Sequence, residues 1–160
     1  MNRRPFLTSL GTLGVSCLAG CSQFRNGDIP AGSLQFENRS DLPHTVGISV
    51  VDVGTESETT ADGYSVSGDV TVPPKQRTLT ASTSVAPGET KTFENVFTES
   101  VYYLTEFTID GTTPDTGGPV PYNPSPPGRQ YYAIIMGVVY TSGEFSYVNR
   151  STDNAGDFKR

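Results

Sequence analysis

Several short segments of this 160-residue chain alternate apolar and polar residues, and no stretch repeats its apolar residues every three or four positions. The clearest segment is 45–53 (TVGISVVDV), in which Val46, Ile48 and Val50 fall on one side. A period of two indicates a β-strand with one face in a core, because successive side chains of a strand point to opposite faces of the sheet. The pattern therefore predicts an all-β fold.

Further strands follow from the same pattern. We expect them at 33–38, within 64–72, and at 78–85, 91–97, 101–110 and 144–149. Residues 131–140 (YYAIIMGVVY) are almost all apolar, which predicts a central strand covered on both faces. Residues 54–63 and the Pro-rich segment 111–129 are expected to be loops. Seven or eight strands with short turns are typical of an antiparallel sandwich of two sheets.

The first 20 residues have the organisation of an export signal. Arg3 and Arg4 precede Pro5-Phe6-Leu7 and a weakly apolar stretch that ends in small residues. That stretch is about 14 residues long, too short to span a hydrocarbon core of ~30 Å as a helix. The Arg-Arg-x-Phe-Leu run resembles the twin-arginine export motif. The alternative is an ordinary Sec signal.

Cys21 closes the run Leu18-Ala19-Gly20-Cys21, which resembles a lipobox. The resemblance implies cleavage before Cys21 and attachment of membrane lipid to its sulfur. Cys17 would leave with the signal, so the mature chain could form no internal disulfide. The alternative is a plain cleavage site with an incidental cysteine.

The chain is expected to consist of four parts. They are the signal peptide 1–20, a lipidated tether 21–32, a β-sandwich 33–150 and a polar tail 151–160. The mature protein is then expected at the extracytoplasmic face of the cell membrane, held there by its lipid.

Charge limits the partners of this chain. It has 17 acidic and 11 basic residues and a net charge of −6, which becomes more negative when Arg3 and Arg4 are removed. Such a surface repels nucleic acid. The acidic, lysine-poor composition is similar to that of proteins from salt-loving archaea, in which twin-arginine lipoproteins are common. The alternative is an ordinary acidic exported protein.

The run 86–93 (APGETKTF) precedes a Tyr-rich strand that ends in Ile109-Asp110-Gly111. Together they resemble small immunoglobulin-like or cupredoxin-like β-sandwich domains of archaeal surface lipoproteins, over roughly residues 33–149. A blue-copper site needs two histidines and a cysteine thiolate. The chain has His44 alone, and Cys21 is at the lipid end. We therefore expect no copper, no other metal and no cofactor.

Few residues suggest a binding or modification site. His44 lies at the mouth of a predicted strand and Tyr122 lies in the Pro-rich segment, where exposure is expected, so both are candidate ligand contacts. Tyrosines at 102–103 and 131–132 could add an aromatic platform. Asn38 and Asn149 begin Asn-x-Ser sequons in predicted turns and are candidate glycosylation sites.

These features predict a non-catalytic binding module at the cell surface. Its expected partners are membrane lipid through Cys21 and an envelope protein or glycan. A structural envelope protein without a small ligand is the alternative. A small hydrolase would require a carboxylate and a serine within hydrogen-bond reach of His44, and no Gly-x-Ser-x-Gly motif is present. An ordered 111–129 segment over an aromatic groove would favour binding.

Overall fold

The computed structural model describes residues 29–158, so Arg3, Arg4 and Cys21 lie outside the described residues. The described part is built almost entirely of strands. They are β1 (Leu34–Asn38), β2 (His44–Gly54), β3 (Glu56–Thr60), β4 (Gly63–Ser67), β5 (Thr80–Val85), β6 (Thr90–Phe93), β7 (Tyr102–Ile109), β8 (Val120–Tyr122), β9 (Tyr132–Val139) and β10 (Phe145–Thr152), with one short helix, α1 (Pro74–Arg77). No helix within 29–158 combines the length and the apolar character needed to cross a membrane.

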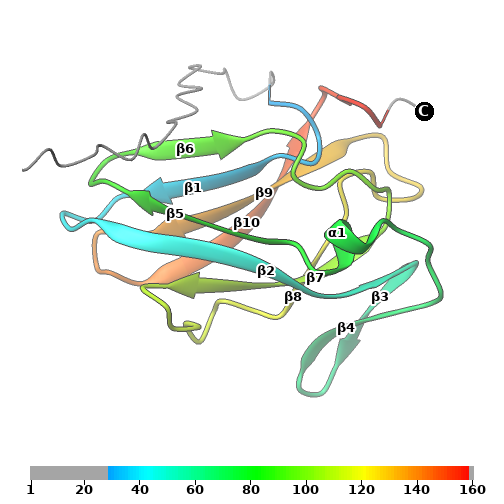
Figure 1. Ribbon diagram of the computed structural model, residues 1–160, viewed down its shortest axis with the longest axis horizontal. Coiled ribbons are helices and arrows are strands. Elements are labelled where there is room, and N and C mark those ends of the chain that lie inside the picture. The colour runs from blue at the N-terminus through cyan, green and yellow to red at the C-terminus, as the bar shows by residue number, and fades with distance from the viewer. Residues whose placement is uncertain (1–28, 159–160) are drawn as a thin grey trace, which may run out of the picture.

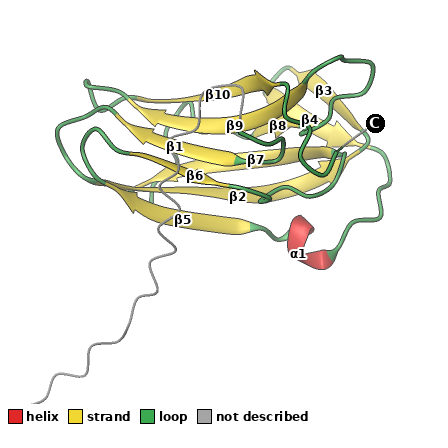
Figure 2. Cartoon of the chain, turned by 90° about the horizontal axis from the view of Figure 1, so that it is seen from above, coloured by secondary structure: helices red, strands yellow, loops and turns green. Residues whose placement is uncertain are grey.

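Two four-stranded sheets form the body of the molecule (Figure 1). One has the order β10-β9-β1-β6 and the other β5-β2-β7-β8. Figure 2 shows them as two stacked layers. The predicted all-β sandwich of two sheets is confirmed. One pair departs from the antiparallel pattern, because β1 runs parallel to β9, with Leu34 opposite Ile135.

The core fills the space between the sheets, as the alternation predicted. Val46, Ile48 and Val50 of β2 are 1%, 2% and 8% exposed. From the other sheet, Phe36 of β1 meets Phe107 of β7 edge-on, with ring centroids 6.4 Å apart. Period-two patterning thus identified the residues that hold the two layers together.

β9 is the central strand that the apolar run predicted. It lies between β10 and β1, and every residue from Ala133 to Val139 is buried. A Cβ added to Gly137 would lie 3.0 Å from ring atoms of both Phe107 and Phe145. Glycine at this position therefore lets two aromatic rings pack directly against the backbone of β9.

A third, two-stranded sheet replaces the loop expected at 54–63. β3 and β4 form a hairpin that projects from the body at one end, at the lower right of Figure 1. All five residues of β3 are exposed, so the strand has no apolar face and no alternation to reveal it. With this hairpin and the short β8, the described residues contain ten strands, more than the seven or eight expected.

The packed body also extends past the boundaries expected at 33 and 150. Ile29 and Ala31 are 2% and 1% exposed. The Thr152 hydroxyl donates to Ile29 O at 2.7 Å, and Ala31 N–H donates to Asn154 O at 2.9 Å. The end of the expected tether and the start of the expected tail are thus joined to each other in the sandwich.

A buried polar network connects α1 to the core. Tyr103, fully buried, donates from its hydroxyl to Gln76 Oε1 at 2.7 Å and accepts from Glu99 N–H at 3.1 Å. Gln76 Nε2 donates to Val96 O at 3.1 Å. Burial raises the pKa of Tyr103 to about 12. A tyrosine hydroxyl bonded to backbone four residues upstream is the contact of a tyrosine corner, a device of β-sandwiches.

Candidate functional site

A pocket of about 210 Å³ lies where the segment after β8, the start of β9 and the end of β10 come together. Residues from four separate stretches of the chain line it. The lining residues include Tyr102, Asn123, Arg129, Tyr131, Asn149 and Arg150. Antiparallel pairing of Tyr132 with Thr152 places the beginning of β9 beside the end of β10, which brings residues about 20 positions apart to one site.

Tyr122 fixes the first wall of this pocket from inside the core. It is 1% exposed, its hydroxyl donates to Ala133 O at 2.7 Å, and its ring meets Phe97 with centroids 4.9 Å apart. Burial raises its pKa well above the usual value. Side chains alternate along β8, so a buried Tyr122 turns Pro121 and Asn123 the other way, and both line the pocket.

The expectation that Tyr122 is exposed and contacts a ligand is therefore wrong. The Pro-rich composition suggested a solvated loop, but residues 120–122 pair with β7 as strand β8. Tyr122 acts on the pocket only indirectly, by holding its neighbours in place.

Hydrogen bonds hold the segment after β8 against the body. Ala133 N–H donates to Pro124 O at 2.9 Å, and Ser125 N–H donates to Asn123 Oδ1 at 2.9 Å. The Ser100 hydroxyl donates to Ser125 O at 3.3 Å. This part of the Pro-rich segment thus forms a wall joined to the beginning of β9 and to the segment before β7.

The opposite wall comes from the end of β10. Asn149 Nδ2 donates to Pro121 O at 3.2 Å, which connects the two sheets across the end of the sandwich. Arg150 extends along the sheet, with Nη1 3.9 Å from Met136 Sδ. Asn149 lies in a strand and not in the predicted turn, and it is exposed. Its glycosylation stays a prediction.

The charge of the pocket differs from that of the chain. Two arginines line it and no carboxylate does, although acidic residues outnumber basic ones by 17 to 11. Tyr131 is 40% exposed and Tyr102 is half-buried, so both rings are accessible at the pocket. Such a lining supplies hydrogen-bond donors and aromatic faces, and no charged acceptor.

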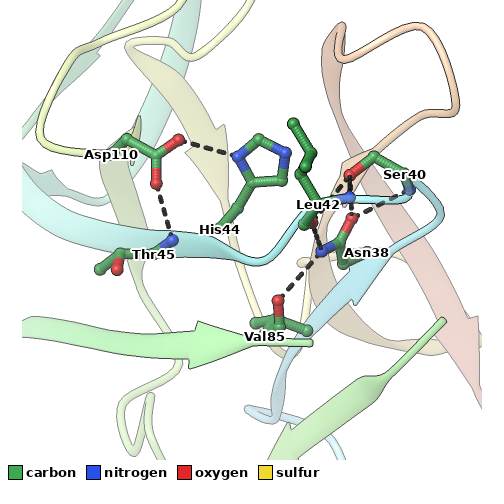
Figure 3. Close-up of polar contacts among 7 residues, drawn as sticks. All are labelled: Asn38, Ser40, Leu42, His44, Thr45, Val85 and Asp110. Atoms are coloured by element: carbon green, nitrogen blue, oxygen red, sulfur yellow. Dashed lines mark hydrogen bonds and ion pairs between the residues drawn. The ribbon is translucent and has the colours of Figure 1, made fainter. Parts of the chain in front are cut away.

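The other candidate contact, His44, lies outside this pocket and pairs with a carboxylate (Figure 3). Its Nδ1–H donates to Asp110 Oδ2 at 2.8 Å, while Asp110 Oδ1 accepts from Thr45 N–H at 2.9 Å. These bonds, with the one to His44 first, lower the pKa of Asp110. The pair joins the start of β2 to the residue that follows β7. In the described part of the chain the imidazole bonds to the carboxylate of Asp110 and not to a serine hydroxyl, which the hydrolase alternative would require.

Asn38, the other sequon asparagine, is fully buried (Figure 3). Its Nδ2 donates to Leu42 O at 2.7 Å and to Val85 O at 3.0 Å. Its Oδ1 accepts from the Ser40 backbone N–H at 2.9 Å and from the Ser40 hydroxyl at 2.8 Å. The candidate glycosylation of Asn38 is therefore corrected, because both amide hydrogens are used and no solvent reaches the nitrogen. The turn was predicted, but not that its first side chain points inward.

Sequence reasoning identified the tyrosines of the pocket and missed its arginines. Arg150 stands within the Asn149 sequon and Arg129 closes the Pro-rich segment. The scarcity of basic residues was the one available signal, and it does not show which of them come together. Among residues 29–158, no group of three or more His, Cys, Asp or Glu side chains is placed to hold a metal ion.

Comparison with protein-family models, with curated proteins and with solved structures finds no match to this chain.

Proposed function

We propose that this chain is a lipid-anchored extracytoplasmic protein, and that its sandwich binds a component of the cell envelope without catalysis. Arg3 and Arg4 direct export by the twin-arginine route, and Cys21 carries the lipid. The ligand contacts the pocket that contains Tyr131 and Arg150.

The observation that carries the binding role is that the pocket is already built. Backbone and side-chain hydrogen bonds fix both walls, through Ala133, Asn123 and Asn149. A preformed pocket binds at a smaller entropic cost than a loop that orders on contact. This is the arrangement of residues 111–129 that favours binding over a purely structural role.

The path of the chain gives the pocket an orientation. Ile29 O accepts from Thr152, which directly follows the pocket residue Ser151, and Gly32 N–H donates 3.2 Å to the pocket residue Ala133. The tether therefore joins the sandwich at the end that holds the pocket. Ile29 is eight residue steps along the chain from Cys21, and eight steps reach on the order of 29 Å when fully extended. The ligand is then a component close to the membrane surface.

The anchor is tested by Cys21→Ser, which removes the sulfur that would carry lipid. We expect the protein to leave the membrane fraction, whereas Cys17→Ser, a matched change inside the leader, should keep it there. Mass spectrometry should show the wild-type chain beginning at a lipidated Cys21. Sedimentation of Cys21→Ser with membranes, or an intact amino terminus in the wild type, would contradict the proposal.

The binding role is tested by capture of the lipidated protein from its own membranes. Envelope components recovered with the wild type should be lost with the double variant Tyr131→Ala/Arg150→Gln. They should be retained with Arg39→Gln, because Arg39 is exposed and its N–H bonds Val139 O at the far end of β9. Recovery of the same components with the double variant, or of none with the wild type, would favour the structural role instead.

A further inference from the structure

We infer that two copies of this chain pair edge to edge through β10, so that two four-stranded sheets continue into each other across a two-fold axis at Val148. This inference goes beyond the proposed binding function and does not depend on its ligand.

The edges of the two sheets differ in how far they are closed. β5 and β6 are bridged by Lys91, whose Nζ donates to Ser84 O at 2.6 Å. β8 has only three residues, and its Pro121 O is already bonded to Asn149. β10 is an edge strand of eight residues without proline, lysine or a break in its register with β9. Proteins use such devices to blunt long edges, because the unpaired backbone groups of an edge otherwise recruit another strand. β10 is therefore the edge best suited to pairing.

The direction of the backbone groups in β10 follows from the bonds of β9. Ile135 N–H donates to Ser33 O at 3.2 Å, beside the start of β1. The odd-numbered residues of β9 therefore bond toward β1, and the even-numbered ones bond toward even-numbered partners on β10. The N–H groups of Tyr147, Asn149 and Ser151 consequently point away from β9, to an edge where no strand of the described chain pairs with them.

A two-fold axis at Val148 gives each of these donors an acceptor. In antiparallel pairing, Tyr147 of one copy lies opposite Asn149 of the other, and the two residues exchange backbone hydrogen bonds. Ser151 N–H lies opposite Phe145 O of the second copy. That oxygen already accepts from a threonine hydroxyl and has a second lone pair.

The apolar side chains of the outer face favour pairing between identical strands. Val148 is 38% exposed and lies opposite Met136 of β9. Alternation turns both away from the core, against which Phe145 and Tyr147 pack. At the axis Val148 meets Val148 of the second copy in a non-hydrogen-bonded pair, in which Cα atoms lie about 4.5 Å apart. A two-fold interface requires such self-complementary contacts.

Charge complementarity favours the same register. Arg150 lies opposite Ser146 of the second copy, and Glu144 is two residues before that serine. Diagonal neighbours of this kind are about 7–8 Å apart, within reach of long side chains. Neither Arg150 nor Glu144 forms an ion pair among residues 29–158. The axis forms this pair twice, which favours a second copy over an unrelated strand.

The tethers of two paired copies can enter the same membrane. Thr152, which alternation places on the outer face with Val148, donates to Ile29 O at 2.7 Å. An axis perpendicular to the sheet keeps both outer faces on one side, so both chains join the sheet from that side. If both copies are anchored as proposed above, their shared membrane also raises their effective concentration.

Disulfide cross-linking tests the position of the axis. The full chain with Cys17→Ser and Cys21→Ser has no thiol, and Val148→Cys adds one. Disulfides span Cα atoms ~4.4–6.8 Å apart, a separation that the pairing provides at Val148. Mild oxidation should convert most of this variant into a covalent dimer. The control is Val51→Cys, at a 54% exposed valine of the other sheet, which should remain monomeric.

Light scattering over a dilution series tests the dimer without cross-linking. The chain with Cys17→Ser and Cys21→Ser should have the mass of two chains at high concentration. Val148→Lys should have the mass of one, because two ammonium groups would meet at the axis, whereas Val51→Lys should remain dimeric. Arg150→Glu and Glu144→Arg should each raise the dissociation constant by about tenfold, and their combination should restore it.

Other outcomes separate this inference from the proposed function. A single-chain mass at every concentration, with no cross-link through Val148→Cys, would overturn the dimer and leave the binding role intact. Equal cross-linking of Val51→Cys, or a dimer that persists in Val148→Lys, would also overturn this joint. A monomer whose captured envelope components are lost in Val148→Lys, but kept in Val51→Lys, would assign the edge to another protein and overturn the second copy.

Discussion

Replacement of Asn38 by alanine tests the buried amide that organises the turn between β1 and β2. In the wild type the side chain makes four hydrogen bonds, two as donor and two as acceptor. In Asn38→Ala, Leu42 O keeps the Ser40 hydroxyl as a donor at 3.0 Å. Ser40 N–H loses its acceptor, and Val85 O loses the donation from Asn38.

The magnitude follows from these two buried groups. Ser40 is 7% exposed and Val85 is fully buried, and a buried polar group that loses its partner costs about 1–3 kcal/mol. We expect the free energy of unfolding to fall by roughly 3 kcal/mol, which lowers Tm by about 10 °C for a domain of this size.

Urea unfolding followed by circular dichroism measures the change. The control is Asn149→Ala, which removes an exposed sequon asparagine with one described hydrogen bond and should cost less than about 1 kcal/mol. If Asn38→Ala unfolds at the same urea concentration as Asn149→Ala, the buried network does not stabilise the turn and our reasoning is refuted. A wild-type protein glycosylated at Asn38 would refute it independently.

Two further predictions concern ionisable groups. His44 lowers the pKa of Asp110, so this contact stabilises the fold fully above the unfolded pKa of about 3.9 and loses its effect as the pH falls through the lower, folded pKa. Asp110→Asn should therefore be slightly less stable than the wild type at pH 7, by less than about 1 kcal/mol because Asp110 is exposed. The difference in urea midpoint should vanish in acid, and a difference that grows in acid would contradict the assignment. Tyr103→Phe deprives Glu99 N–H of its acceptor and should cost about 1–2 kcal/mol. In absorbance titrations, one tyrosine of the wild type should ionise only near the pKa of about 12, and this tyrosine should be missing from the titration of the variant. Ionisation of Tyr103 near pH 10 in the folded protein would argue against its burial.

The strands that sequence predicted well are those with at least one buried face. β2 and β7 alternate over most of their length, and β9 is apolar on both faces. In each case the burial that stabilises the strand also selects its residue types, so the pattern is visible before the fold is known.

In the strands that were missed, burial leaves no alternating pattern in the residue types. β3 (ESETT) pairs with β4 while all five of its residues remain exposed, so no burial selects its residue types. β8 lies within a Pro-rich segment, and its three residues, of which Val120 and Tyr122 are in the core, are too few for their alternation to stand out. Pairing between distant segments, such as β1 with β9, leaves no local signal of any kind.

The candidate site was predictable in part for the same reason. The tyrosines at 102 and 131 suggested an aromatic platform from their residue type alone. Arg129 and Arg150 come to the same pocket only because β9 and β10 pair, and this pairing between strands leaves no signal at either residue in the sequence. The burial of Asn38 was not visible in the sequence, because Val85, which accepts from its amide, is 47 residues away and becomes a neighbour only in the folded chain.

The position of β1 sets the order in which the chain can fold. β1 lies inside its sheet between β6 and β9, and its partner β9 begins at Tyr132, about a hundred residues later. A chain still emerging from the ribosome has one side of β1 open until β9 has also been synthesised. Pairing over such a separation is slow, and unpaired strand edges favour aggregation. The sheet therefore cannot close until β9 is available to pair, and the open edge of β1 exposes the new chain to self-association during that interval.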